Sequence, residues 1–235
     1  MAVWNCLKNS LVYSLKRDGF GVVFFDFCND GLFVAFEDGQ MQFCKVIEGQ
    51  AHGEALVFFA NAHIVCGCLF RKKVMLLTDD SRLLVFEVQN GVVLTHQFTE
   101  IHLGGQEHNG FFAIAHREGG NEVILSGKNR SLRIVSIDLD TSKVQLKYKM
   151  QDAVDKYNWK CTGFSNHGSF DASFTFASAG AKGRHLIYLW ENSTSNLVHK
   201  IEGPKEESTQ VLWSPIKPQL YSVGALSGKI YVFGP

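Results

Sequence analysis

Two cysteines with the spacing of metal ligands form the first candidate site. Cys66-Gly-Cys68 lies in a strand-like run, so its two thiols would point to one face of the strand. His52 and His63 could complete a ligand set, yet no second cysteine pair follows at the spacing of a zinc ribbon. We therefore expect small buried apolar side chains at these positions, and neither a metal nor a cofactor.

A second group of residues has the chemistry of a nucleophilic site. Ser165 is followed by His167 and Asp171, the residue types that together activate a serine hydroxyl. The segment lacks the Gly-x-Ser-x-Gly pattern that exposes such a serine on a sharp turn. Nearby, Gly180-Ala-Lys-Gly183 is too short for a phosphate-binding loop and precedes no helical pattern. The sequence therefore favours a binding protein without a small-molecule substrate over a hydrolase.

The elements that carry these residues repeat along the chain. A polar turn followed by a short alternating apolar strand occurs five times, at 38–45, 80–87, 129–136, 184–191 and 227–234. The ends of the repeated strands, at Val46, Val88, Ile137, Trp190 and Phe233, are 42 to 53 residues apart. A period near 40–45 residues with about four strands per unit is typical of WD40 propeller blades. Trp190 and Trp213 are the expected aromatic core of these blades.

This period predicts an all-β fold, a shortened WD40 β-propeller of about five blades. One domain would span residues 1–235, with repeats at 17–49, 50–91, 92–140, 141–196 and 197–235. A lone blade cannot bury both of its faces, so the blades must stack on one another. In a closed ring the first and last blades also cover each other. The strand Ser10–Leu15 is predicted to close the ring by pairing with the last blade. Two stacked sheets, or an incomplete ring that dimerises, are the alternatives.

Composition limits the classes of function. The chain has 235 residues, of which 46% are hydrophobic and 20% charged, as in folded proteins and not in disordered ones. The formal net charge is zero, so no global field attracts nucleic acid. We find no signal-peptide pattern and no apolar run near the ~20 residues of a membrane span. Together with six cysteines in mostly apolar runs, this favours a reducing, intracellular compartment.

The last two repeats carry a more specific pattern. Residues 149–161 are followed by Gly163-Phe-Ser165, His185-Leu-Ile-Tyr-Leu-Trp-Glu191 and Val211-Leu-Trp-Ser-Pro215. This segment resembles the retinoblastoma-binding protein five family, the WD40 subunit of COMPASS and MLL histone methyltransferase complexes. The resemblance covers residues 149–233, about a third of the chain. On that alignment two of the family's seven blades are absent, and its acidic tail has no counterpart.

The resemblance implies a non-catalytic scaffold in the nucleus. Its partners would be a SET-domain methyltransferase that acts on lysine four of histone three, other COMPASS-like core subunits, and the nucleosome. The partner subunit, and not this chain, would bind the methyl donor. The alternatives are a generic WD-repeat adaptor in another complex, and a propeller enzyme, which the apolar, small residues of the inner strands disfavour.

The resemblance also assigns site residues. The positions that would meet nucleosomal DNA are Arg117, Arg133, Lys156, Lys182 and Arg184. These residues could instead be ordinary solubilising charges. Tyr157 and Trp159 would contact a partner protein, although Trp159 could equally anchor its own loop.

Overall fold

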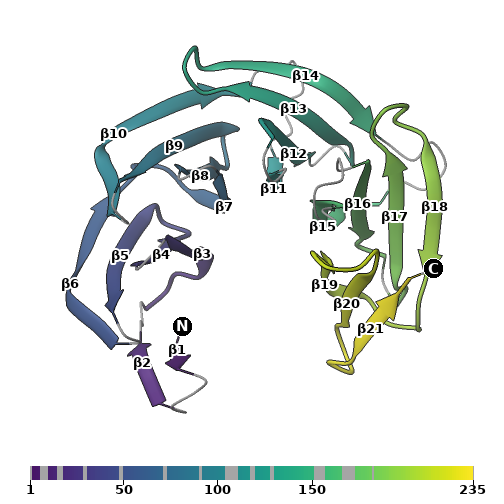
Figure 1. The fold of residues 1–235 in the computed structure, drawn as a ribbon, viewed down its shortest axis with the longest axis horizontal. Coiled ribbons are helices and arrows are strands. Elements are labelled where there is room, and N and C mark those ends of the chain that lie inside the picture. The colour runs from purple at the N-terminus through teal and green to yellow at the C-terminus, as the bar shows by residue number, and fades with distance from the viewer. Residues whose placement is uncertain are drawn as a thin grey trace. The chain divides into compact units, whose positions relative to one another are not determined.

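A computed structural model describes residues 2–5, 10–14, 18–28, 31–47, 50–70, 73–89, 92–103, 111–116, 120–127, 130–150, 157–165, 173–181 and 183–234. Every regular element in these ranges is a β-strand (Figure 1). The chain divides into two compact units, Met1–Gly104 and Gly105–Pro235. Within the described residues there is no helix of the length and apolarity that crossing a bilayer requires.

The first unit contains a hairpin and two four-stranded antiparallel sheets. The hairpin pairs β1 (Ala2–Asn5) with β2 (Ser10–Ser14). The first sheet has the order β3 (Val22–Cys28), β4 (Gly31–Phe36), β5 (Gln40–Ile47) and β6 (Gln50–Phe59), and the second has the order β7 (Ile64–Phe70), β8 (Lys73–Thr78), β9 (Arg82–Gln89) and β10 (Val92–His102).

The core of the first unit lies between these two sheets. Phe33 and Phe43 of the first sheet are buried with Leu76 and Phe86 of the second. β4 is buried along its whole length, because a strand inside a stack is covered on both faces. The following turn requires a glycine: Gly39 has a φ of +86°, and a Cβ there would lie 2.3 Å from the carbonyl oxygen of Ala62.

The second unit contains two four-stranded sheets and one three-stranded sheet among its described residues. Their strands are β11 (Phe111–His116), β12 (Glu122–Gly127), β13 (Leu132–Asp138) and β14 (Lys143–Met150); β15 (Trp159–Phe164), β16 (Phe174–Ala179), β17 (Leu186–Glu191) and β18 (Leu197–Glu202); and β19 (Ser208–Trp213), β20 (Leu220–Gly224) and β21 (Ile230–Phe233). Each sheet is an antiparallel meander in chain order.

Two clusters of buried side chains fill the spaces between these three sheets. Leu132 and Ile134 pack with Trp159 and Tyr188 between the sheets β11–β14 and β15–β18. Residues such as Phe176 and Val211 pack between the sheets β15–β18 and β19–β21. Each sheet thus buries apolar residues against its neighbour in the chain, as stacked blades must.

The predicted all-β class and its five strand-rich repeats are confirmed by these sheets. The repeat boundaries predicted from sequence divide the chain differently from the sheets. Each repeat after the first begins with the last strand of one sheet and ends with the third strand of the next, as β6 to β9 do in repeat 50–91. The described pairing of β2 is with β1, in the register Trp4↔Leu11. Ring closure through this strand, and a single domain over the whole chain, stay predictions.

Candidate interaction site

Trp159 is the aromatic centre of the segment that carries the family resemblance. It is the first residue of β15, and its side chain is 0% exposed. Its indole Nε1 donates a hydrogen bond to the carbonyl oxygen of Arg130 at 2.8 Å, and its ring meets Tyr188 and Trp190 edge-on at 5.1 and 5.2 Å. A buried indole N–H needs such an acceptor. Trp159 therefore anchors its segment to the β12–β13 connection, and the structure gives no support to a partner contact through its side chain.

Tyr157, Arg184 and Glu202 form a polar cluster at the surface, which we call the Arg184 cluster. The guanidinium of Arg184 donates to the hydroxyl of Tyr157 at 3.1 Å and to the carboxylate of Glu202 at 3.0 Å. The three residues come from the segment before β15, the β16–β17 turn and the end of β18. Arg184 and Glu202 are exposed, while the half-buried ring of Tyr157 lies 6.4 Å from that of Tyr188. The buried aromatic residues thus support a charged surface made by one sheet.

Two of the five predicted DNA-contacting residues lie within the described structure. Arg133 lies on β13 with its Cζ atom 5.5 Å from the ring centroid of Phe111, and Arg184 belongs to the Arg184 cluster. Arg117, Lys156 and Lys182 lie outside the described residues. A shared basic surface of all five positions therefore stays a prediction, and both described arginines have partners within the chain.

Glu206 is a residue that the sequence analysis missed. Its carboxylate is 5% exposed and accepts hydrogen bonds from the backbone N–H groups of Leu226 and Ser227, both at 2.9 Å. The hydroxyls of Ser227 and Tyr231 also donate to it, both at 2.7 Å. These four bonds, led by the Ser227 hydroxyl, lower the pKa of Glu206 to about 2. An ionised carboxylate therefore fastens the β18–β19 connection to the β20–β21 turn.

His185 lies next to this network. Its ring is edge-on to that of Tyr231 at 5.5 Å, and the residue is 1% exposed. Burial lowers the pKa of its imidazole, although the negative charge of Glu206 acts in the opposite direction. The neutral ring therefore serves as a packing residue between the last two sheets.

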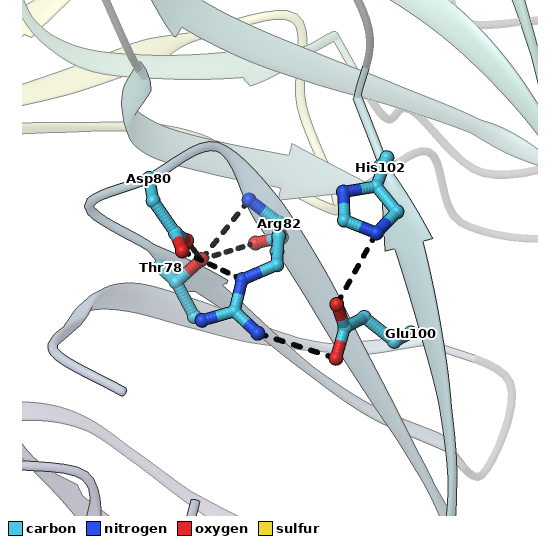
Figure 2. Close-up of polar contacts among 5 residues, drawn as sticks. All are labelled: Thr78, Asp80, Arg82, Glu100 and His102. Carbon is cyan, nitrogen blue, oxygen red and sulfur yellow. Dashed lines mark hydrogen bonds and ion pairs between the residues drawn. The ribbon is translucent and has the colours of Figure 1, made fainter. Parts of the chain in front are cut away.

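A second polar network fixes a turn in the first unit (Figure 2). Arg82 pairs with Asp80 at 2.7 Å and with Glu100 at 3.2 Å, and His102 lies 3.3 Å from the other oxygen of Glu100. The buried hydroxyl of Thr78 donates to Asp80 and accepts from the backbone N–H of Arg82. The hydrogen bond from Arg82 is the main cause of the lowered pKa of the Asp80 carboxyl. The network ties the β8–β9 turn to β10 and leaves no evident catalytic geometry.

Of the candidate catalytic and metal residues, those that the structure describes form no reactive centre. Cys68 is buried, and burial raises the pKa of its thiol, which disfavours the thiolate that binds metal. The described residues contain no group of three potential metal ligands. Ser165 is buried and accepts a hydrogen bond from the backbone N–H of Phe174, while His167 and Asp171 lie outside the described residues. The hydroxyl of Ser165 therefore helps to join the end of β15 to the start of β16.

The two predicted core tryptophans occupy different environments. Trp190 is buried among Trp159 and Tyr188. Trp213 is partly buried between the sheets β15–β18 and β19–β21, where its ring stacks on that of Phe176 with the centroids 6.4 Å apart.

Comparison with solved structures defines the class of the fold. The chain is similar to the crystallised β-propeller domain of Cps50 (Swd1) from Myceliophteria thermophila, with a TM-score of 0.68 and 15% identity. The match covers 100% of this chain and 90% of that one. The chain thus has the fold of a β-propeller protein, as its repeat period predicts. No family model matches the sequence.

The sequence relatives each match up to half of the chain. It is 41% identical over 112 residues to the Set1 complex component swd1 of Schizosaccharomyces pombe, and 32% identical over 120 residues to the COMPASS component SWD1 of Saccharomyces cerevisiae. These matches cover 47% and 49% of the chain, but 26% and 28% of the two relatives. The retinoblastoma-binding protein 5 homolog of Drosophila melanogaster is 36% identical over 78 residues, which are 33% of this chain and 15% of that protein. The predicted resemblance is confirmed, and the chain spans about a quarter of the length of its Swd1 relatives.

Proposed function

We propose that this chain is a non-catalytic WD40 scaffold subunit of a COMPASS-like complex that methylates lysine four of histone three. It would help to place a SET-domain methyltransferase on the nucleosome, in the nucleus. The observation that carries this proposal is the 41% identity with a Set1 complex component, in a chain whose fold resembles the Swd1 propeller.

The Arg184 cluster is the proposed contact surface, with Tyr157 facing a partner protein and Arg184 facing the DNA of the nucleosome. Tyrosine and arginine, two of the three residues in this cluster, are enriched at protein interfaces. The cluster is already positioned by bonds within one sheet, so little side-chain entropy would be lost on binding. It lies in the segment that carries the family resemblance.

Affinity purification of the tagged chain from its native cell, followed by mass spectrometry, tests the proposal. We expect a SET-domain protein and other core subunits among the recovered proteins. Recovery of a different set of subunits would support the generic adaptor and contradict the COMPASS assignment.

A double variant, Tyr157→Phe with Arg184→Ala, tests the contact itself. We expect it to reduce co-purification while its thermal unfolding stays close to that of the parent, because Arg184 and Glu202 are exposed and Tyr157→Phe keeps the half-buried ring. Lys143→Ala is the matched control, since Lys143 is an exposed cation on β14, in another sheet. Equal recovery with both variants would exclude the Arg184 cluster and leave the assignment to the complex intact.

A further inference from the structure

The connection from the end of β18 to the start of β19 carries three carboxylates. Its sequence is Glu202-Gly-Pro-Lys-Glu-Glu207. The carboxylate of Glu206 is buried, and its four hydrogen bonds fasten the connection to the β20–β21 turn. Glu202 and Glu207 instead pair with cations of the sheet β15–β18. The buried carboxylate thus fixes the segment from which the other two reach the surface.

Two cations at the surface are the partners of these carboxylates. Glu202 accepts a hydrogen bond from Nη2 of Arg184 at 3.0 Å, and Glu207 accepts one from the ammonium group of Lys160. The side chain of Arg184 is 48% exposed and that of Lys160 is 44% exposed. Ion pairs that water reaches contribute little to stability. An anion from outside the chain can therefore replace either carboxylate at small cost.

Both cations border the turn between β16 and β17. Arg184 ends this turn, where its backbone N–H donates to the carbonyl oxygen of Ala181 at 2.9 Å. The stem of Lys160 lies beside its beginning, because the Cε atom of Lys160 would be 3.3 Å from a Cβ on Gly180. The N–H of Gly180 donates to the carbonyl oxygen of Asn158 at 2.7 Å, which joins the turn to the segment before Lys160. One anionic ligand that follows the turn can thus reach both cations.

The chemistry of the two pairs favours phosphate as the incoming anion. A carboxylate from a partner protein would replace Glu202 or Glu207 by the same group, so no stronger bond would offset the entropy lost on association. Duplex DNA differs, because each phosphate that a cation neutralises releases condensed counterions. The planar guanidinium of Arg184 can also donate to two phosphate oxygens at once.

We infer that Glu202 and Glu207 compete with DNA for Arg184 and Lys160, and that they limit the affinity of this surface for phosphate. The inference rests on the proposed contact of Arg184 with nucleosomal DNA, and it adds Lys160 to that contact. When DNA binds, its phosphates take the place of the carboxylates, which turn to solvent. Such competition disfavours DNA that no other contact of the complex holds in place, and so contributes to specificity.

Binding of a short, fluorescein-labelled DNA duplex to the full chain tests this inference. Glu202→Gln with Glu207→Gln keeps the size of both side chains and removes both charges. At a fixed salt concentration, this glutamine variant should bind the duplex about 3- to 10-fold more tightly, the effect expected from two exposed ion pairs. Fluorescence anisotropy measures the affinity. An affinity equal to or below that of the parent would overturn the inference.

A matched control separates this competition from an effect of net charge. Asp140→Asn with Glu191→Gln also removes two negative charges from the second unit. Asp140 lies in the turn after β13, and Glu191 ends β17 at the opposite end of that strand from Arg184. The control should bind the duplex as the parent does. A gain equal to that of the glutamine variant would show that net charge alone is responsible and that the inference is wrong.

Combining the glutamine variant with Arg184→Ala and Lys160→Ala shows whether the cations are the source of the gain. The glutamines should then give little or no gain, because the groups that the carboxylates hold are gone. If the alanines weaken DNA binding but the glutamines never strengthen it, the inference is wrong and the DNA contact stands. If the alanines leave DNA binding unchanged with and without the glutamines, the inference and the DNA contact of Arg184 are both wrong, whereas co-purification still tests membership of the complex.

An acidic protein segment is the competing occupant of this surface. A hexaglutamate peptide should not displace the labelled duplex from the glutamine variant at concentrations at which the unlabelled duplex does. Displacement by the peptide would overturn the assignment to DNA and would favour an acidic partner.

Discussion

Trp159 carries the sharpest prediction about a single side chain. Trp159→Ala should lower the free energy of unfolding by about 3–5 kcal/mol, because it empties a buried site between two sheets. Trp159→Phe keeps an aromatic ring but lacks the indole N–H that bonds to the carbonyl oxygen of Arg130. It should therefore still lower the free energy of unfolding, by about 1 kcal/mol or more. Urea denaturation measures both. Tyr157→Phe is the control, since it removes only a bond at the surface; an equal loss in that variant would contradict the anchoring role of Trp159.

The acid dependence of stability should report on Glu206. Its pKa of about 2 in the folded chain lies below the ordinary value of 4.5, so the folded state binds the proton more weakly than the unfolded state. The stability that this carboxylate contributes is therefore present above pH 4.5 and lost as the pH falls toward 2. Glu206→Gln should be less stable than the parent at neutral pH, and the difference should shrink in this window. A difference that is constant from pH 6 to pH 2.5 would exclude an ionised carboxylate as the source.

At the scale of residues, the sequence identified the important side-chain types but not all of their roles. It singled out Trp159, yet left open whether the ring contacts a partner or anchors its own loop, because the sequence does not show which groups surround that segment. Glu206 gave no signal at all. Its partners Leu226, Ser227 and Tyr231 follow 20 to 25 positions later, and only the pairing of β20 with β21 brings them to the carboxylate.

The turn between β20 and β21 gives a prediction at the scale of elements. A Cβ at Gly224 would lie 2.4–2.5 Å from the carboxyl atoms of Glu206, which four hydrogen bonds hold in place. Gly224→Ala should therefore destabilise the chain by about 1–3 kcal/mol, as overpacking does. Thermal unfolding measures the change, with Gly21→Ala as the control, because the nearest atom to a Cβ there is 3.7 Å away.

A double-mutant cycle separates this clash from other effects of the alanine. In a Glu206→Ala background the obstructing carboxyl is gone, so Gly224→Ala should cost much less than it does in the parent. The same cost in both backgrounds would show that the glycine is needed for a different reason.

Strands were predictable where their apolar pattern is continuous. β4 and β8 are almost wholly buried, and each contains an uninterrupted apolar run in the sequence. β6 and β10 contain no such run, because polar residues such as His52 and Glu54 or Thr95 and Gln97 interrupt their pattern. Outer strands are held largely by backbone pairing to one neighbour, and that pairing leaves little trace in the sequence.

At the scale of the whole molecule, the repeat period predicted the class of fold but not the way that the repeats join. Strand ends 42 to 53 residues apart are sufficient for five units. Whether the ends meet depends on one pairing, between an N-terminal strand and the last sheet, that no repeat pattern encodes. Strands β1 and β2 pair with one another in the register Trp4↔Leu11, and closure of the ring stays a prediction.

The net charge of zero gives the last prediction, which concerns nucleic acid. A chain without an overall positive field binds DNA only through local cations, so the purified protein should bind bare duplex DNA weakly at physiological salt. A plot of log affinity against log salt should have a shallow slope, near −0.9 per phosphate contact. Arg184→Ala should reduce the magnitude of that slope by about one contact, whereas Tyr157→Phe should leave it unchanged. Mobility shifts between low and physiological salt measure this. If neither Arg184→Ala nor Arg133→Ala changes the slope, neither arginine contacts DNA. The contacts of these arginines within the chain, with Glu202 and Phe111, would then account for both residues.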